Sequence, residues 1–131
     1  MVEHEMGERP DLVSVGSCVL VALLYGKNMY VLNLGDSRAM LATLENQELS
    51  LVKAIQLTEI KYKKVLADHL DDPSPIYGGR LKGKLKLTRA FGVSYLKKSN
   101  MNDALMGILR VQNLCSLPYV YTNPFTKSHQ V

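Results

Sequence analysis

The chain has 131 residues, of which 47% are hydrophobic and 21% charged, and its formal net charge is +4. This length suffices for one domain with a modest core, and no apolar run reaches the roughly 20 residues that a membrane-spanning helix needs. The charge permits an anionic partner without requiring one. The acidic N-terminal residues, interrupted by Gly7 and Pro10, do not resemble a signal peptide, so we expect an intracellular protein.

The first half of the chain is predicted to be mainly β-structure. Residues 1–14 read as the end of a helix that stops before Pro10. Short apolar runs separated by turn-forming residues then predict a three-stranded antiparallel meander, followed by two further strands of the same sheet. These runs are residues 18–24, 29–34, 39–42, 49–52 and 54–57.

The second half is predicted to mix helices with short strands, which makes the whole chain an α+β protein. The predicted elements are a helix that starts at Glu59 and ends before the turn 71–75, a half-buried strand pair with a turn or bulge at Gly83, a helix over 104–111 capped by Asn102 and Asp103, and an edge strand over 117–121. The tail 122–131 has no strong pattern.

Asp36 is the one acidic residue within the predicted meander and is the first candidate site residue. It lies in Gly35-Asp36-Ser37-Arg38, between two predicted strands. Asp and Ser are favoured in turns because their side chains bond to nearby backbone groups. A carboxylate at a strand end can also bind Mg²⁺ or Mn²⁺. Arg38 would either pair with Asp36 or bind an anion.

Three lysines, Lys82, Lys84 and Lys86, alternate with apolar residues and glycine in the predicted strand pair. Such a row would lie on one side of a strand and attract phosphate. The same row would equally serve as a solvated face that protects a sheet edge from pairing. No aromatic residues are interleaved with these lysines, so we expect no nucleic-acid partner.

The histidines and cysteines are not spaced as metal ligands or as a nucleophilic site. Cys18 and Cys115 lie far apart in the sequence, and we expect reduced, buried thiols rather than a disulfide or a metal site. The acidic segment 68–72, which contains His69, is explained by a helix end followed by a turn.

Two groups of motifs resemble the type 2C metal-dependent protein phosphatases. The first is GSCVLVALL followed by MYVLNLGDSRAMLA, and the second is QLTE followed by GGRLKGKLKLTRAFGVSYLK. DHLDDP, YLKK, NDALMGILR and the Pro-Tyr-Val segment further resemble the plant branch with a long insertion after RAFG. The motifs stand in the expected order over about residues 5–129.

The resemblance implies an enzyme that removes phosphate from phosphoserine and phosphothreonine in proteins. It implies a four-layer α/β/β/α sandwich, of which this chain would form an antiparallel sheet with flanking helices. It also implies two Mg²⁺ or Mn²⁺ ions per full domain, which lower the pKa of a bridging water. Asp36 matches a ligand of a third, weaker metal site. The structural positions of the family motifs are occupied in this sequence by Gly35, Ser37, Arg38, Arg89 and Gly92.

The chain resembles only the middle part of that catalytic domain. The motifs that supply the main metal ligands, and an early arginine that binds phosphate, have no counterpart, and the sequence contains no Asp-Gly dipeptide. The element usually written LT-x-DH reads LTEIK, and Val93 follows RAFG where many relatives have Asp. We therefore expect residues 1–131 to form a partial phosphatase-like domain that is inactive by itself. The alternatives are a non-catalytic phosphoprotein-binding or regulatory relic, and a chain whose sheet does not fold stably alone.

Overall fold

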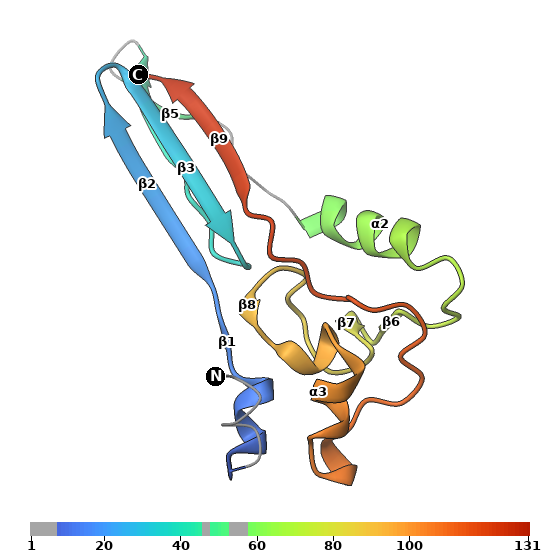
Figure 1. Cartoon of the computed structure of the whole chain (residues 1–131). Helices are drawn as coiled ribbons and strands as arrows, with labels where there is room; N and C mark the ends of the chain where they lie inside the picture. The colour runs from blue at the N-terminus through green and yellow to red at the C-terminus, as the bar shows by residue number, and fades with distance from the viewer. Residues whose placement is uncertain (1–7, 46–47, 53–57) are drawn as a thin grey trace.

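The computed structural model describes residues 8–45, 48–52 and 58–131. Figure 1 shows an elongated sheet that projects from a more compact half. The elements in chain order are η1 (Pro10–Ser14), β1 (Gly16–Ser17), β2 (Val19–Tyr25), β3 (Asn28–Leu34), β4 (Leu41–Glu45), β5 (Glu48–Val52), α2 (Thr58–Asp68), β6 (Ile76–Tyr77), β7 (Arg80–Leu81), β8 (Phe91–Gly92), η2 (Ser94–Leu96), α3 (Ser99–Asp103), η3 (Gly107–Leu109) and β9 (Phe125–Gln130). The α+β prediction with antiparallel sheets is confirmed.

The elongated part is an antiparallel sheet in the order β2–β3–β9. β2 and β3 pair along their whole length around a two-residue turn at Gly26 and Lys27, which confirms the predicted hairpin. β9 pairs with the other side of β3, so that Met29 lies opposite His129. In Figure 1 the C-terminus therefore lies at the far end of this sheet, beside the β2–β3 turn.

The pairing predicted for the third strand of the meander is wrong. The run 39–42 contributes instead to β4, which pairs with β5 in a separate two-stranded sheet. The chain leaves the sheet after β3, where the side-chain amide of Asn33 donates to the carbonyl of Ser37. The other edge of β3 is paired with β9, which lies in the tail where no strand is predicted. The predicted strand 54–57 lies outside the described residues.

The compact half contains the hydrophobic core. Its fully buried side chains come from α2, β7, η2 and the segments before β8 and β9, and include Val65, Leu81, Ala90, Leu96, Tyr119 and Val120. α2 confirms the predicted helix and ends before the turn that contains the two prolines. β1 pairs with β8, so the strand that enters the elongated sheet is also tied to this half.

The helix predicted over 104–111 is wrong. The helix α3 lies earlier, and the only helical turn within that range is the short η3. Asn102 does not cap a helix, because its buried side chain bonds both backbone groups of Val111, each at 2.9 Å. Asn102 thus holds a loop closed. Within this range Leu105 is buried, whereas Ile108 is 83% exposed.

The predicted strand pair around Gly83 and the edge strand over 117–121 are also wrong. β7 is two residues long and pairs with β6, and the chain turns at once because Lys82 has a φ of 48°. Residues 117–121 make only one isolated bridge, Arg89 to Tyr121. Tyr119 lies in the core instead of on a sheet edge.

Two further expectations concern the N-terminal region and the thiols. Residues 1–7 lie outside the described residues, Glu8 is helical as predicted for a helix that stops before Pro10, and Pro10 itself begins the 3-10 helix η1. Both cysteines, Cys18 and Cys115, are free as predicted, but they are exposed instead of buried.

Candidate functional site

The Gly35–Arg38 segment forms the loop by which the chain leaves β3. Gly35 has a φ of +130°, and a Cβ there would lie 2.5 Å from the sulfur of Cys18, the residue before β2. A larger residue would therefore be strained and would collide with Cys18. Asp36, Ser37 and Arg38 are exposed. This geometry agrees with the turn role predicted for the segment.

Asp36 is the residue through which the sequence suggested a metal. In the described part of the chain, no three His, Cys, Asp or Glu side chains come together as a metal site. A centre with two Mg²⁺ or Mn²⁺ ions requires several carboxylates at one place. The described residues therefore do not fit such a centre. The role of Asp36 as a third-site ligand stays a prediction.

The RAFG motif is held by backbone contacts at both of its ends. Gly92 has a φ of +66°, and a Cβ there would overlap the carbonyl oxygen of Val15, the residue before the paired strand β1. At the other end, the amide of Tyr121 donates to Thr88 at 2.9 Å and the amide of Ala90 donates to Tyr121 at 3.1 Å. These two bonds place the side chain of Arg89 beside Tyr121.

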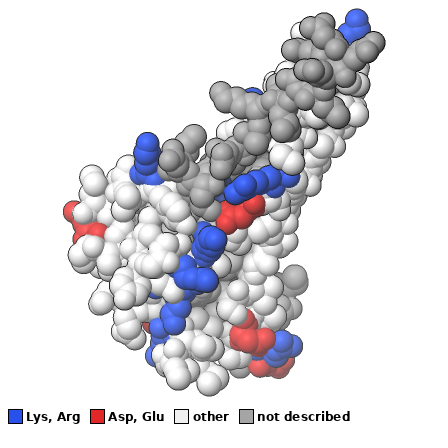
Figure 2. All heavy atoms as spheres, turned by 180° about the vertical axis from the view of Figure 1, so that it is seen from behind, with Lys and Arg blue, Asp and Glu red and all other residues white. Residues whose placement is uncertain are grey.

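The three lysines do not form the expected row. Lys84 and Lys86 are exposed, but Lys82 turns inward, and its side chain is 4% exposed. Its Nζ lies 3.0 and 2.9 Å from the two carboxylate oxygens of Asp72. Lys82 is therefore a core residue, and an anion-facing role stays a prediction only for Lys84 and Lys86. Figure 2 shows Lys and Arg side chains gathered in a line on the back of the compact half.

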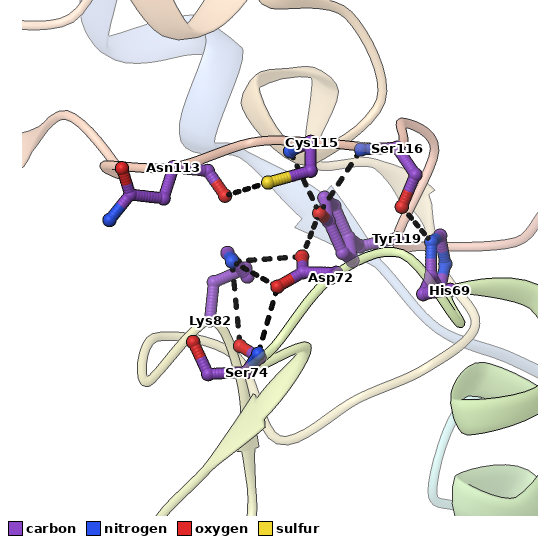
Figure 3. Close-up of polar contacts among 8 residues, drawn as sticks. All are labelled: His69, Asp72, Ser74, Lys82, Asn113, Cys115, Ser116 and Tyr119. Carbon is purple, nitrogen blue, oxygen red and sulfur yellow. Dashed lines mark hydrogen bonds and ion pairs between the residues drawn. The ribbon is translucent and has the colours of Figure 1, made fainter.

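Asp72 is the centre of a buried polar cluster that links three segments of the chain (Figure 3). It accepts hydrogen bonds from Lys82, from the hydroxyl of Tyr119 and from the backbone amide of Ser74 at 2.9 Å. Burial raises the pKa of this carboxyl, but the three donors and the lysine charge outweigh burial and hold the pKa below its ordinary value. The carboxylate is therefore ionised and fully partnered.

The hydroxyl of Tyr119 completes this cluster. It accepts from the backbone amides of Cys115 and Ser116, at 3.1 and 3.3 Å, while it donates to Asp72. All of these groups are used in holding the loops together, so the cluster is structural and leaves no reactive group free. No sequence pattern predicts this cluster, because its members are separated by up to 47 residues and follow no motif.

His69 and Ser116 form a second contact that the spacing did not suggest. The Nδ1 atom of His69 lies 2.7 Å from the hydroxyl oxygen of Ser116, and the ring stacks on Tyr119 with centroids 4.4 Å apart. The other ring nitrogen lies 3.5 Å from the hydroxyl of Tyr121. Among the residues that the structure describes, no carboxylate makes a hydrogen bond to this imidazole to orient it, as a catalytic triad requires. The pair therefore supports the structural interpretation of His69.

The elongated sheet carries an open apolar groove of about 450 Å³. Val21, Leu23 and Tyr30 line it and are 48%, 56% and 42% exposed. Leu23 and Tyr30 are cross-strand partners, so the groove follows one face of the β2–β3 hairpin. A contiguous exposed apolar face of this kind is typical of a surface that packs against another layer.

No helix in the described ranges is long and apolar enough to cross a membrane. The family model described as Protein phosphatase 2C matches residues 3–131. The chain is 62% identical to "Probable protein phosphatase 2C 39" of Oryza sativa subsp. japonica and 59% identical to "Probable protein phosphatase 2C 40" of Arabidopsis thaliana, in each case over 100% of this chain. It spans about a quarter of these relatives, 26% and 28% of their respective lengths. The chain belongs to the protein phosphatase 2C family.

Proposed function

We propose that this chain is a segment of an intracellular, metal-dependent protein serine/threonine phosphatase that uses Mg²⁺ or Mn²⁺. The observation that carries the proposal is the family match over residues 3–131, supported by 62% and 59% identity to two relatives named as phosphatases of this type. Because the chain spans about a quarter of those relatives, we assign the activity on phosphoserine and phosphothreonine to a longer polypeptide.

The open face of the sheet supports this assignment. A β-sandwich buries one face of each sheet against the other, with alternating residues of both strands in the interface. Val21, Leu23 and Tyr30 alternate in this way and remain exposed here. In the proposed phosphatase this face packs against a layer contributed by other residues.

The metal centre is likewise proposed to be shared with other residues. Asp36 would contribute to a third ion, and the described residues contain no cluster that could hold the others. We therefore propose that residues 1–131 contribute to the fold of the phosphatase but do not hydrolyse phosphate esters by themselves. The non-catalytic alternative, a relic that binds phosphoproteins without turnover, predicts the same inactivity for the isolated chain.

An exchange of segments separates these two functions. Residues 1–131 replace the matching segment of the rice relative, and Mn²⁺-dependent release of phosphate from a phosphothreonine peptide is compared with that of the unaltered relative. The phosphatase proposal predicts activity within about tenfold of the parent. It predicts a loss on Asp36→Asn and no change on Asp103→Asn, an exposed acid of α3. A folded chimaera without activity, beside an active parent, would favour the relic.

A further inference from the structure

A small pocket of about 170 Å³ lies between α2 and the segment that precedes β9. Its lining residues are Lys64, Arg89, Tyr121 and Asn123. Two of them are cations, one offers a side-chain amide and one an aromatic ring. None of them belongs to the buried cluster around Asp72. A pocket that gathers two positive charges with a neutral donor has the composition of an anion site.

The positions of the two cationic residues, Arg89 and Lys64, are set by the elements that carry them. Arg89 and Tyr121 are partners in a parallel bridge, so their side chains leave neighbouring segments on the same side. From the facing helix, the Nζ atom of Lys64 lies 5.1 Å from the centre of the Tyr121 ring. Arg89 and Lys64 thus approach the same tyrosine from two different elements.

The two cations differ in how far they are already engaged. In the ranges that the structure describes, the guanidinium of Arg89 makes no hydrogen bond or ion pair. Lys64 pairs with Asp68 at 3.0 Å, and the two side chains are 61% and 38% exposed. An exposed pair one helical turn apart is weak and is easily exchanged for another partner. Both cations are therefore available to a ligand.

Tyr121 and Asp68 set the charge at the rim of the pocket. The hydroxyl of Tyr121 donates to Asp68 at 2.7 Å. Burial, together with this hydrogen bond, raises the pKa of Tyr121, so the phenol is neutral at physiological pH and does not repel an anion. Asp68 is the one acid in contact with the pocket's lining residues in the described part of the chain, and it competes with any anion for Lys64.

We propose that this pocket binds a phosphate-type oxyanion, either a phosphate monoester group or inorganic phosphate. The planar fork of Arg89 would hold two oxygens of the anion, a geometry that guanidinium groups favour. Lys64 would supply a point charge, and the amide of Asn123 a neutral hydrogen bond. This assignment does not depend on the proposed phosphatase activity, since binding requires neither a metal nor turnover.

The test is a titration of the 131-residue chain with inorganic phosphate. Binding is monitored through amide chemical shifts, and chloride keeps the ionic strength constant. The shifts are expected to centre on residues 64, 89, 121 and 123. Arg89→Gln should weaken binding by about tenfold or more, because charged hydrogen bonds of this kind are lost. The phosphate affinity of Arg89→Lys should lie between those of the wild type and Arg89→Gln, because lysine keeps the positive charge but lacks the planar guanidinium. Lys27→Gln removes an exposed lysine in the β2–β3 turn and should leave binding unchanged.

Asp68 provides a variant that works in the opposite direction. Asp68→Asn should strengthen phosphate binding several-fold, because it frees Lys64 and removes the competing charge. Asp103→Asn, the matched control, removes a negative charge away from the pocket. Its phosphate affinity should be almost unchanged, because salt screens the charge at that distance. A site made only of diffuse positive charge would respond to both substitutions, and to Lys27→Gln and Arg89→Gln, by the same factor. That result, or the absence of saturable shifts, would overturn the proposal.

A second arm distinguishes the two sources of the anion. A phosphoserine peptide and its unphosphorylated form are titrated under the same conditions as inorganic phosphate. Tighter binding of the phosphopeptide identifies a phosphoprotein group as the ligand, and equal binding identifies the free anion. If the amide spectrum of Arg89→Gln shows an unfolded protein, the substitutions Lys64→Gln and Asp68→Asn at exposed positions test the proposal instead. Lys64→Gln should weaken phosphate binding, and Asp68→Asn should strengthen it.

Discussion

The Nζ atom of Lys82 lies 2.9 Å from a carboxylate oxygen of Asp72, and the two side chains are 4% and 0% exposed. A buried ion pair is stable only when its remaining hydrogen-bonding capacity is met. Here Tyr119 and the backbone of Ser74 supply the further donors to Asp72. This pair therefore joins the turn after α2, the segment after β7 and the loop before β9 into one unit.

Breaking the pair from the lysine side should destabilise the fold strongly. Lys82→Met leaves the Asp72 carboxylate buried without its countercharge, and we expect the free energy of unfolding to fall by about 3–5 kcal/mol. Lys84→Met, two residues away and exposed, should change it by less than about 0.5 kcal/mol. Urea unfolding followed by circular dichroism measures both. Similar small effects for the two variants would show that the ion pair does not hold the fold.

The same carboxylate predicts how stability changes with pH. The pKa of Asp72 is lower in the folded protein than in the unfolded chain, where it is about 3.9. The stabilisation is thus complete above the unfolded pKa and is lost as the pH falls through the folded pKa. Unfolding free energies measured by urea from pH 7 to pH 3 should therefore decrease below about pH 4.

Asp72→Asn is the control for this pH dependence. The variant should be less stable at neutral pH and should lose less stability on acidification, because the titrating group is gone. Asp68 and Asp11, whose pKa values are also lowered, are exposed, so Asp68→Asn and Asp11→Asn should retain most of the wild-type slope. An unchanged slope in Asp72→Asn would assign the effect to other carboxyl groups.

Gly92 offers a test of the contact between β1 and β8. Gly92→Ala would place a Cβ against the carbonyl oxygen of Val15 at a φ of +66°, and strain of this kind costs about 1–3 kcal/mol. Gly107→Ala is the matched control, because nothing lies within 4 Å of a Cβ at that position. Thermal unfolding of the two variants should show a clear loss for the first and almost none for the second. Equal losses would mean that the close approach is easily relieved.

Local patterns in the sequence were sufficient for the elements whose partners are near in the chain. The β2–β3 hairpin needs only two apolar runs and a two-residue turn, and α2 needs only helical spacing and a proline-containing stop. β9 could not be found in this way, since it is an edge strand of mostly exposed side chains whose backbone pairs with β3 about 100 residues earlier.

The candidate site shows the same division. The turn role of Gly35 and Ser37 follows from residue types that favour turns, and the structure agrees with it. The placement of Lys82 could not be predicted, because alternation suggested an exposed row while a positive φ turns this residue inward onto Asp72. Asn102 illustrates a further ambiguity, since the side chain that caps helices also closes loops.

The most direct test of the account is a phosphatase assay of purified residues 1–131 with a phosphothreonine peptide and Mn²⁺. Amide exchange first establishes that the sheet is formed, with slow protons expected in β2 and β3. We predict no Mn²⁺-dependent release of phosphate above that of the buffer, because the described residues contain no cluster that could hold the metal ions. Mn²⁺-dependent turnover by this chain that disappears on Asp36→Asn would contradict the account.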